Sequence, residues 1–507
     1  MSETGDISLT RLSYGFARQY GVLVTQQDGM PVLIRKEETT LEALIEARRA
    51  VDRPVPVKKV GTADFESLLA KTYAHGDLAE TAETAMGGPE DLNALADNLP
   101  RTSDLLDSED DAPVIRLING ILQEAIRTRA SDIHIEPDSN VLRLRQRIDG
   151  VLHETLLNEV NIASALVLRL KLMANLDISE KRLPQDGRFN IRAKGQSVDI
   201  RMSTMPVQHG ESVVMRLLNQ SAGLRKLEAS GIPSDLLVRL RQQLRRPHGM
   251  ILVTGPTGSG KTTTLYGALS ELNEPGKKII TAEDPVEYRL PRVNQVQVNP
   301  KINLDFSTIL RTFLRQDPDI ILIGEMRDHE TVEIGLRAAL TGHLVLSTLH
   351  TNDAVDSALR MMDMGAPGYL VASAVRAVVA QRLVRKVCTD CIVEDELDEP
   401  RKQWLSVRFP NQVGMPFVKG RGCQNCNLTG YRGRIGVFEM LELEQNMMDA
   451  LRANDAVGFA QTARQSENYK PLLASAMELA LQGVVSLDEI MYLGEGDASG
   501  ATDPIYL

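Results

Sequence analysis

The sequence is poor in cysteine and in aromatic residues, and it has no long apolar run. Its 507 residues include four cysteines and one tryptophan, and aromatic residues make up 4%. A chain of this length can bury several cores without disulfide staples, so a small disulfide-dense secreted domain is excluded. No apolar run is long enough for a transmembrane helix, and the N-terminus lacks the features of a secretory signal. We therefore expect a cytosolic protein of about three domains, with only a peripheral membrane role.

Basic residues are fewer than acidic ones, but the excess of acid is local. The chain has 57 Lys and Arg against 68 Asp and Glu, a net charge of −11. Residues 77–111 alone hold eleven acidic residues and one basic residue, a net charge of −10, so the rest of the chain carries −1. Such a segment repels itself and has little apolar surface to bury, which predicts an extended linker. The scarcity of aromatics, which stack bases in single-strand channels, counts more against nucleic acid than the charge does.

Composition and local pattern predict an α/β multidomain protein. Within the second N-terminal domain, residues 142–148 alternate cleanly and Asp149-Gly150 predicts a hairpin. The arginines on one face of that strand (Arg143, Arg145 and Arg147) indicate either a solvated face or a subunit interface. The predicted divisions are an N-terminal domain (1–76), the linker (77–111), a second N-terminal domain (112–222), a joint (223–234), an α/β core (235–386), a cysteine-rich subdomain (387–436) and a C-terminal helical subdomain with a tail (437–507).

The core alternates strand and helix, which is typical of a parallel sheet. Four apolar strands are predicted, at 250–254, 278–282, 320–323 and 344–347.

A phosphate-binding loop follows the first of these strands. Residues 255–262 read Gly-Pro-Thr-Gly-Ser-Gly-Lys-Thr and fit the pattern G-x-x-x-x-G-K-[ST] between a strand and a helix. In such loops backbone N–H groups surround phosphate oxygens, the lysine reaches the β- and γ-phosphates, and the hydroxyl binds Mg²⁺. We expect those roles for Lys261 and Thr262, the alternative being a glycine-rich turn that binds nothing. The predicted nucleotide-binding residues are Gly255, Pro256, Thr257, Gly258, Ser259, Gly260, Lys261, Thr262 and Thr263.

Acidic residues follow two other predicted strands. Glu325 comes after the apolar run 320–323 and a glycine, and it is predicted to hold Mg²⁺ through water. Glu283, Asp284 and Glu287 follow the strand at 278–282, and one of them is expected to orient the attacking water. Ligands bind at this carboxyl edge in open α/β sheets. The alternative is a solvated cluster of acids at strand ends.

The four cysteines form two C-x-x-C pairs. Cys388 and Cys391 are separated from Cys423 and Cys426 by 31 residues. Two such knuckles supply four thiolates in tetrahedral array, which suits a structural Zn²⁺. A disulfide is unusual in a cytosolic protein, so disulfides, free thiols or redox chemistry remain the alternatives.

Together these motifs resemble a known family. Residues 282–288 resemble its Asp box, 321–328 its Walker B, and 341–352 its His box. With the phosphate loop they are similar to the secretion-superfamily ATPases, which drive type II secretion, type IV pilus assembly and related machines. The resemblance implies a hexameric ATP-driven motor. Each subunit would join a PAS-like N-terminal domain to a RecA-like ATPase domain, moving about the joint near Gly231.

The resemblance also implies further catalytic residues. Arginines at four matching positions would neutralise transition-state charge. Arg311 and Arg315 are expected to share a helix face, with helix-surface solvation as the alternative. His350 would sense the γ-phosphate or position water, whereas His343 at the other end of the strand is predicted to be structural. The residues implied as catalytic are Lys261, Glu283, Glu325, His350, Arg201, Arg216, Arg311 and Arg315.

The cysteine pairs and the N-terminal residues favour one branch of the family. The tetracysteine insert resembles that of the secretion and pilus-extension ATPases, and residues 12–23 resemble the first domain of type II secretion ATPases. The resemblance implies that residues 1–76 dock on the cytoplasmic domain of an inner-membrane platform protein (GspL-like), with a GspF-like polytopic protein as a second partner. Alternatively, these residues only cap the motor. Pilus extension, a nucleic-acid motor and a non-enzymatic scaffold are the other functions considered.

Overall fold

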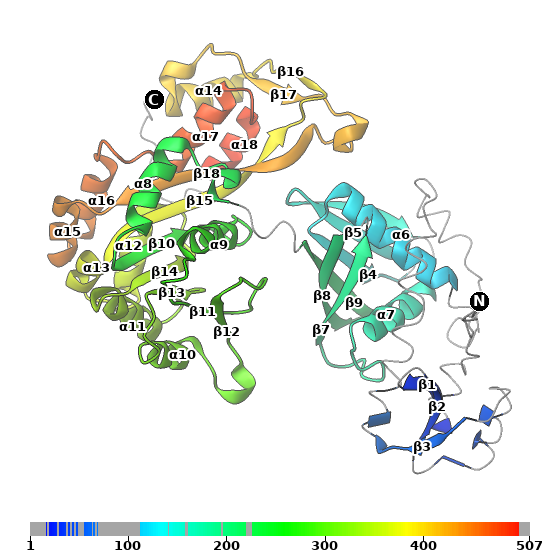
Figure 1. Cartoon of the computed structure of the whole chain (residues 1–507). Coiled ribbons are helices and arrows are strands. Elements are labelled where there is room, and N and C mark those ends of the chain that lie inside the picture. The colour runs from blue at the N-terminus through cyan, green and yellow to red at the C-terminus, as the bar shows by residue number, and fades with distance from the viewer. Residues whose placement is uncertain are drawn as a thin grey trace, which may run out of the picture. The chain divides into compact units, whose positions relative to one another are not determined.

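The computed structural model describes residues 112–495, except 140, 158–160, 194–195 and 220–225, together with parts of residues 17–68. The chain divides into two compact units, residues 1–221 and 222–507 (Figure 1). The predicted linker at 77–111, the first part of the joint and the end of the tail lie outside the described residues. Within the described ranges, no helix combines the length and apolarity needed to cross a membrane.

The first unit begins with a small three-stranded sheet. Strands β1 (Val22–Gln27) and β2 (Met30–Arg35) pair antiparallel, and β3 (Val57–Lys59) adds parallel to β2. Val22 and Leu33 are buried between the sheet and the helical residues around Ala47.

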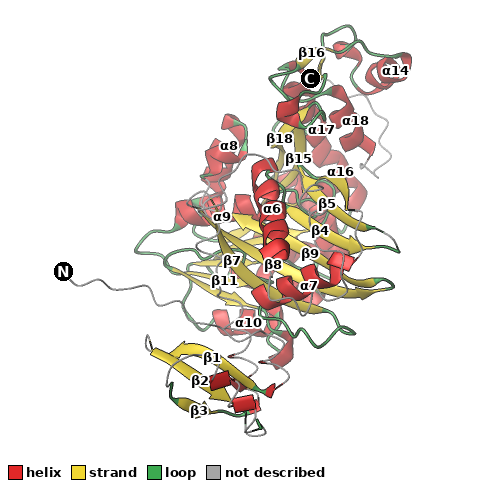
Figure 2. Cartoon of the chain, turned by 90° about the vertical axis from the view of Figure 1, so that its right-hand side faces the viewer, coloured by secondary structure: helices red, strands yellow, loops and turns green. Residues whose placement is uncertain are grey.

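The rest of the first unit is a six-stranded antiparallel sheet covered on one face by two helices. Its strand order is β6-β5-β4-β9-β8-β7. Apolar residues of α6 and α7 pack with one face of the sheet in a single core, and the two helices lie side by side (Figure 2). The predicted hairpin is confirmed, because Ile148 pairs with Val151 across Asp149-Gly150. The elements are α6 (Ala112–Thr128), β4 (Asp132–Pro137), β5 (Leu142–Ile148), β6 (Val151–Leu157), α7 (Asn161–Met173), β7 (Gln185–Ala193), β8 (Gln196–Val207) and β9 (Gly210–Asn219).

The arginine face of β5 is occupied by ion pairs within the same sheet. Arg143 lies 3.0 Å from Asp138, and Arg145 lies 2.7 Å from Glu136. These partners balance the charges within the unit, and both the solvated face and the subunit interface stay predictions.

A seven-stranded sheet forms the centre of the second unit. Its strand order is β12-β11-β13-β14-β10-β15-β18, and every pair is parallel except β15 with β18. The predicted strands correspond to β10 (Gly249–Thr254), β11 (Ile279–Glu283), β13 (Ile320–Ile323) and β14 (Leu344–Leu349). Three further strands were not predicted: β12 (Val293–Gln297), β15 (Val375–Val387) and β18 (Tyr431–Glu442).

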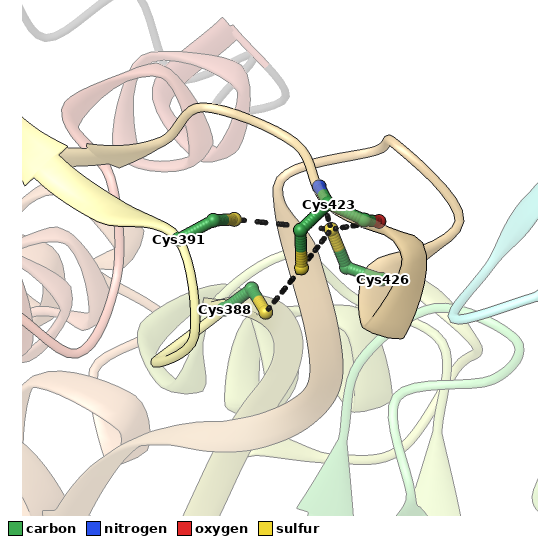
Figure 3. A group of neighbouring side chains, drawn as sticks. All are labelled: Cys388, Cys391, Cys423 and Cys426. Atoms are coloured by element: carbon green, nitrogen blue, oxygen red, sulfur yellow. Dashed lines mark hydrogen bonds between the residues drawn. The ribbon is translucent and has the colours of Figure 1, made fainter.

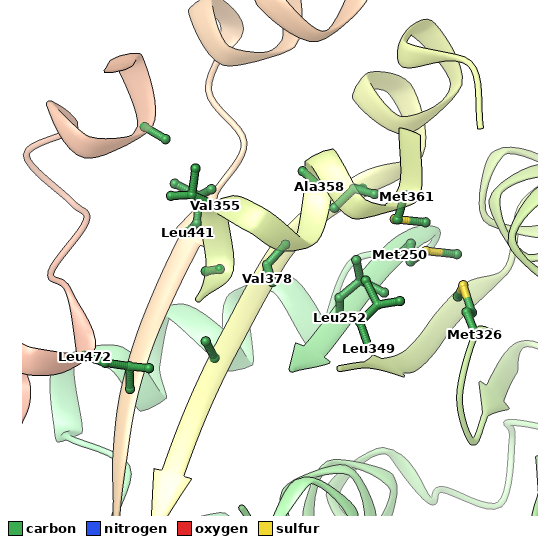
Figure 4. Close-up of a cluster of buried hydrophobic side chains, with 14 of the residues drawn as sticks. Met250, Leu252, Met326, Leu349, Val355, Ala358, Met361, Val378, Leu441 and Leu472 are labelled. Carbon is green, nitrogen blue, oxygen red and sulfur yellow. The ribbon is translucent and has the colours of Figure 1, made fainter. Parts of the chain in front are cut away.

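Helices cover both faces of this sheet, as expected when parallel strands are apolar throughout. Side chains alternate between two cores: Met250 and Leu252 face one, while Ile251 and Val253 face the other. Figure 4 shows part of the first core, where α12 packs on β15 and β18. The second core is closed by α8 and α9. The covering helices are α8 (Ser234–Leu244), α9 (Lys261–Leu272), α10 (Phe306–Phe313), α11 (His329–Leu340), α12 (Ala354–Asp363) and α13 (Gly368–Ala374).

The remaining elements follow β15. The antiparallel pair β16 (Ile392–Glu394) and β17 (Val418–Gly420), with α14 (Glu399–Arg408), lies between β15 and β18 in the chain. After β18 come α15 (Gln445–Arg452), α16 (Ala456–Arg464), α17 (Leu472–Leu481) and α18 (Leu487–Glu495). Gly231, in the predicted joint, packs against Ile435 and Gly436 of β18, so it belongs to the body of the second unit.

Candidate functional site

The phosphate loop lies at the carboxyl edge of the sheet, between the end of β10 and the start of α9. Gly255, Gly258 and Gly260 have φ angles of 139°, 81° and 92°, which side chains strongly disfavour. A Cβ at Gly255 would also lie 2.4 Å from the carbonyl oxygen of Gln381. Lys261 Nζ donates to the carbonyl oxygens of Gly255 (2.7 Å) and Pro256 (3.0 Å). The loop therefore folds around its own lysine, in the cradle that phosphate oxygens occupy in such loops.

Glu325 and His350 lie beside this loop, as expected from the sequence. They follow β13 and β14, which are neighbours in the sheet, so both residues reach the same edge. His350 Nε2 lies 3.5 Å from Glu325 Oε2, and Arg327 Nη2 lies 2.6 Å from Glu325 Oε1. Glu325 is nearly buried, whereas half of the His350 side chain is exposed.

The pKa values of this cluster follow from burial and mutual charge. Burial lowers the pKa of Lys261 to about 8, against the opposing effect of Glu325. Burial and the charge of Lys261 lower the pKa of His350, and Glu325 again opposes the change. The charges of Lys261, Glu325 and His350 act on one another, so these three predicted residues lie close together.

Two further arginines belong to this cluster and were not predicted. Arg327 contacts Glu325, and Arg382 on β15 donates to the backbone oxygen and side-chain Oδ1 of Asn352, the latter at 3.0 Å. The charge of Arg382 also contributes to the lowered pKa of Lys261. Arg327 lies close to the Walker B acid in the sequence, which was a usable signal. Arg382 reaches the site only through the pairing of β15 with β10.

Gln381 supports the phosphate loop from the neighbouring strand β15. It is buried, its Nε2 donates to the carbonyl oxygen of Ser259 (2.7 Å), and its Oε1 accepts from the hydroxyl of Thr264 (2.7 Å). One side chain thus fixes both the loop and the first turn of α9.

Gln381→Ala should weaken ATP binding about tenfold, because the Ser259 carbonyl and the Thr264 hydroxyl lose their buried partner. The dissociation constant can be measured with a fluorescent ATP analogue. Gln243→Ala is the matched control, since Gln243 is also buried but bonds Glu442 instead. Equal affinities for the Gln381 and Gln243 variants would contradict this role.

Glu283 is held in a buried hydrogen-bond network. It accepts from the hydroxyls of Tyr266 and Thr281 and from Nε2 of Gln295 at 3.1 Å. Burial and the charge of Glu283 raise the pKa of Tyr266. The carboxylate thus stabilises the end of β11. Which acid of the Asp box, Glu283, Asp284 or Glu287, activates water remains a prediction.

The predicted arginines lie in two places. Arg201 and Arg216 face each other on β8 and β9 of the first unit, and Arg216 lies 2.9 Å from Asp132. Arg311 pairs with Glu330 on the second unit. The prediction that Arg311 and Arg315 share a helix face is wrong.

The helix α10 ends at Phe313, so Arg315 lies beyond it. Arg315 instead donates to the carbonyl oxygen of Arg311 at 2.8 Å.

His343 lies at the amino end of β14 and contacts the carbonyl oxygen of Ala338 at 3.0 Å, far along the strand from His350.

The four cysteines converge at one end of the sheet (Figure 3). Val387 on β15 pairs with Tyr431 on β18, so the knuckle that follows β15 meets the knuckle that precedes β18 despite the long gap between them. The sulfur atoms all lie within 4.8 Å of one another, and three of the four cysteines are buried. Their closest separations, 3.7 to 3.9 Å, far exceed the about 2.05 Å of a disulfide bond.

The environment of the cysteines suits a metal bound by thiolates. Cys426 Sγ accepts from the backbone N–H groups of Cys423 (3.1 Å) and Gly430 (3.3 Å). Burial acts against ionisation of Cys426, but these N–H groups and the hydrogen bonds with the Cys423 and Cys391 side chains together outweigh it and lower its pKa to about 7. Burial raises the pKa of Cys388 to about 12, so this thiol ionises only beside a strong positive charge. The cluster is therefore compatible with a structural zinc ion.

The fold and the site define a class of protein: a P-loop ATPase with additional N-terminal domains and a four-cysteine insert. The chain belongs to the family of type II/IV secretion system proteins, which it matches over residues 107–492. Residues 11–73 also match the family model of an N-terminal domain of GSPII protein E.

Curated relatives are similar over nearly the whole chain. Type II secretion system protein E of Aeromonas hydrophila is 43% identical over 97% of both chains. Type II secretion system ATPase E of Vibrio cholerae is 41% identical over 96% of both chains.

Two solved structures share the fold. The pilus retraction motor PilT with bound ADP matches with a TM-score of 0.52 at 27% identity. The match covers 75% of this chain and 97% of the PilT chain. The Legionella pneumophila ATPase DotB matches with a TM-score of 0.56 at 20% identity. The match covers 75% of this chain and 96% of the DotB chain. The predicted α/β fold class and the family resemblance are thereby confirmed.

Proposed function

We propose that this chain is the ATPase that drives pseudopilus assembly and protein export in a type II secretion system. The observation that carries the proposal is the grouping of Lys261, Glu325 and His350 around the phosphate loop, in a chain of the secretion family. The relatives named for type II secretion span nearly the whole chain, and residues 11–73 match the model of an N-terminal domain of GSPII protein E.

The residues at the sheet edge divide the work of phosphoryl transfer. The loop N–H groups and Lys261 bind the phosphates of ATP, and Lys261 leaves its loop carbonyls to do so. Thr262 and Glu325 would hold Mg²⁺, which neutralises charge on the β- and γ-phosphates when bound. His350, fixed against Glu325, orients water or the γ-phosphate. Arg201, Arg216, Arg311 and Arg315 complete the charge balance in the assembled hexamer.

The cysteine cluster would hold zinc as a structural ion. Removing it with a chelator, or replacing Cys426 with Ser, should lower the Tm by about 5 °C, because the thiolates at 388–391 and 423–426 then repel or separate. Metal content by mass spectrometry and calorimetry on the same sample test this expectation. Purified protein without zinc, and with a Tm unaffected by chelator, would contradict it.

Assembly and location follow from the same proposal. The chain forms a hexamer in the cytoplasm, and residues 1–76 attach it to the cytoplasmic domain of a GspL-like inner-membrane protein. A GspF-like polytopic protein is the second partner. The domain match over residues 11–73 supports the docking role.

Phosphate release by the purified full chain tests the enzymatic part of the proposal. Turnover that requires Mg²⁺ and rises with the platform protein's cytoplasmic domain is the expected result. Stimulation by single-stranded DNA instead would favour a nucleic-acid motor. If neither the platform domain nor DNA produced turnover, the chain would be a non-enzymatic scaffold.

A further inference from the structure

Glu439 is a buried carboxyl group outside the nucleotide site. It lies on β18 and is 1% exposed. Across the sheet it pairs with Ala380 on β15, and Ala380 pairs with Thr254, the last residue before the phosphate loop. Glu439 therefore stands two strands away from the loop, at the same edge of the sheet.

Its two oxygens serve two different helices. Oε1 accepts the backbone N–H of Ala354, the first residue of α12, at 2.5 Å. Oε2 accepts the backbone N–H of Leu472, the first residue of α17, at 2.7 Å, and the hydroxyl of Tyr469 at 3.2 Å. Helix α17 follows Pro471, whose side chain offers no cap, so Glu439 caps it from another strand.

The surroundings of Glu439 fix this arrangement. Burial and the charge of Asp353 raise its pKa to about 8, while the N–H groups of Ala354 and Leu472 act in the opposite direction. Val355, Leu441 and Leu472 belong to the apolar cluster around it (Figure 4). A polar group buried in such a cluster is costly unless it is satisfied, so its contacts are maintained.

The residues just before α12 form the catalytic loop 350–353. His350 contacts Glu325, and the hydroxyl of Thr351 lies 2.7 Å from that of Thr254. Asn352 accepts from Arg382. The loop is thus tied to the nucleotide site at one end and to Glu439, through the N–H of Ala354, at the other.

We propose that Glu439 is a positioning residue for ATP hydrolysis, which holds the loop 350–353 in place and links it to the C-terminal helices. This inference rests on the proposed ATPase activity. Displacement of the loop moves His350 while leaving the phosphate loop intact. Loss of the Glu439 contact therefore lowers kcat and leaves KM for ATP unchanged.

Glu439→Gln weakens the link that Glu439 makes between α12 and α17 with a single substitution. An amide keeps one accepting oxygen, but its NH₂ group cannot accept, so one of the two backbone N–H groups loses its partner. Glu442→Gln is the matched control: Glu442 lies on the same strand but bonds Arg239 and Gln243 of α8.

The measurements are steady-state ATP hydrolysis by the full chain and hydrogen exchange at Ala354 and Leu472. For Glu439→Gln we expect kcat to fall about tenfold with KM unchanged, and faster exchange at the start of α12 or α17. The control should match the wild type in kcat and in exchange at both residues. Faster exchange at Ala354 with an unchanged kcat would overturn the inference, because the contact would then be structural only.

A second variant decides the matter if Glu439→Gln does not fold. Ala354→Pro removes the N–H that Oε1 accepts, at the first position of α12 where proline is tolerated, and it should lower kcat about threefold. An unchanged kcat in this folded variant would overturn the inference. Wild-type chain without turnover would instead refute the proposed function itself, so the two failures are distinguishable.

Discussion

Replacing Lys261 with Ala should lower ATP hydrolysis by about 10³-fold or more, because the preorganised cation at the β- and γ-phosphates is removed. Among the described residues, Lys261 donates hydrogen bonds only to loop carbonyls, so its removal leaves the other contacts of the fold in place. The Tm of the variant should therefore stay close to that of the wild type. Phosphate release and thermal unfolding, measured on the same preparation, separate the two effects.

Lys277→Ala provides the matched control for this substitution. Lys277 follows α9, is partly exposed and pairs with Glu274, so its loss removes the same charge away from the phosphate loop. Its turnover should equal that of the wild type. Substantial hydrolysis by the Lys261 variant would show that the phosphate loop is not the catalytic site.

Glu325→Gln should lower kcat about 10²-fold and leave ATP affinity nearly unchanged. The substitution removes the negative charge that contacts Arg327 and His350 and that would hold Mg²⁺ through water. The phosphate loop, by contrast, keeps every hydrogen bond it makes to Gln381 and Lys261. Single-turnover hydrolysis, together with ATP binding at equilibrium, measures the two quantities separately.

Glu333→Gln is the control for the loss of charge. Glu333 lies on α11 and pairs with Arg337 and His329, away from the sheet edge. If both glutamate variants retained wild-type kcat, Glu325 would be a structural acid and another carboxylate would have to hold the metal.

The sequence predicted those parts of the site that lie close to a strand end. A phosphate loop has fixed spacing, and Glu325 and His350 each follow an apolar strand, so parallel pairing brings them to one edge. The four cysteines were predictable as a cluster because two C-x-x-C pairs accounted for all of them. Their meeting depends on the pairing of β15 with β18, which spacing alone does not reveal.

Residues that reach the site through sheet pairing were not predictable from local pattern. Gln381 lies 117 residues from its partner Thr264, and Glu439 lies 85 residues from Ala354. Neither stands in a recognisable motif. Their roles arise because β15 and β18 extend the sheet beyond β10, and β15 was itself missed as a strand.

The end of α10 shows a different limit. The prediction that Arg311 and Arg315 share a face assumed a helix that continues past Phe313. The nearest strong stop signal is Pro318, yet the helix ends earlier, with Leu314 as its C-cap. Helix ends are the least certain feature of a sequence pattern, because terminal residues exchange helical hydrogen bonds for tertiary ones at little cost.

Export by living cells tests the central claim, that this chain powers type II secretion, most directly. Cells that lack the chain are complemented with the wild type or with the Lys261→Ala variant, and secreted proteins in the medium and surface pili are both quantified. We predict that the wild type restores export, that the variant does not, and that pili are normal throughout. Normal export accompanied by loss of pili would contradict the proposal and identify the chain as a pilus-assembly ATPase.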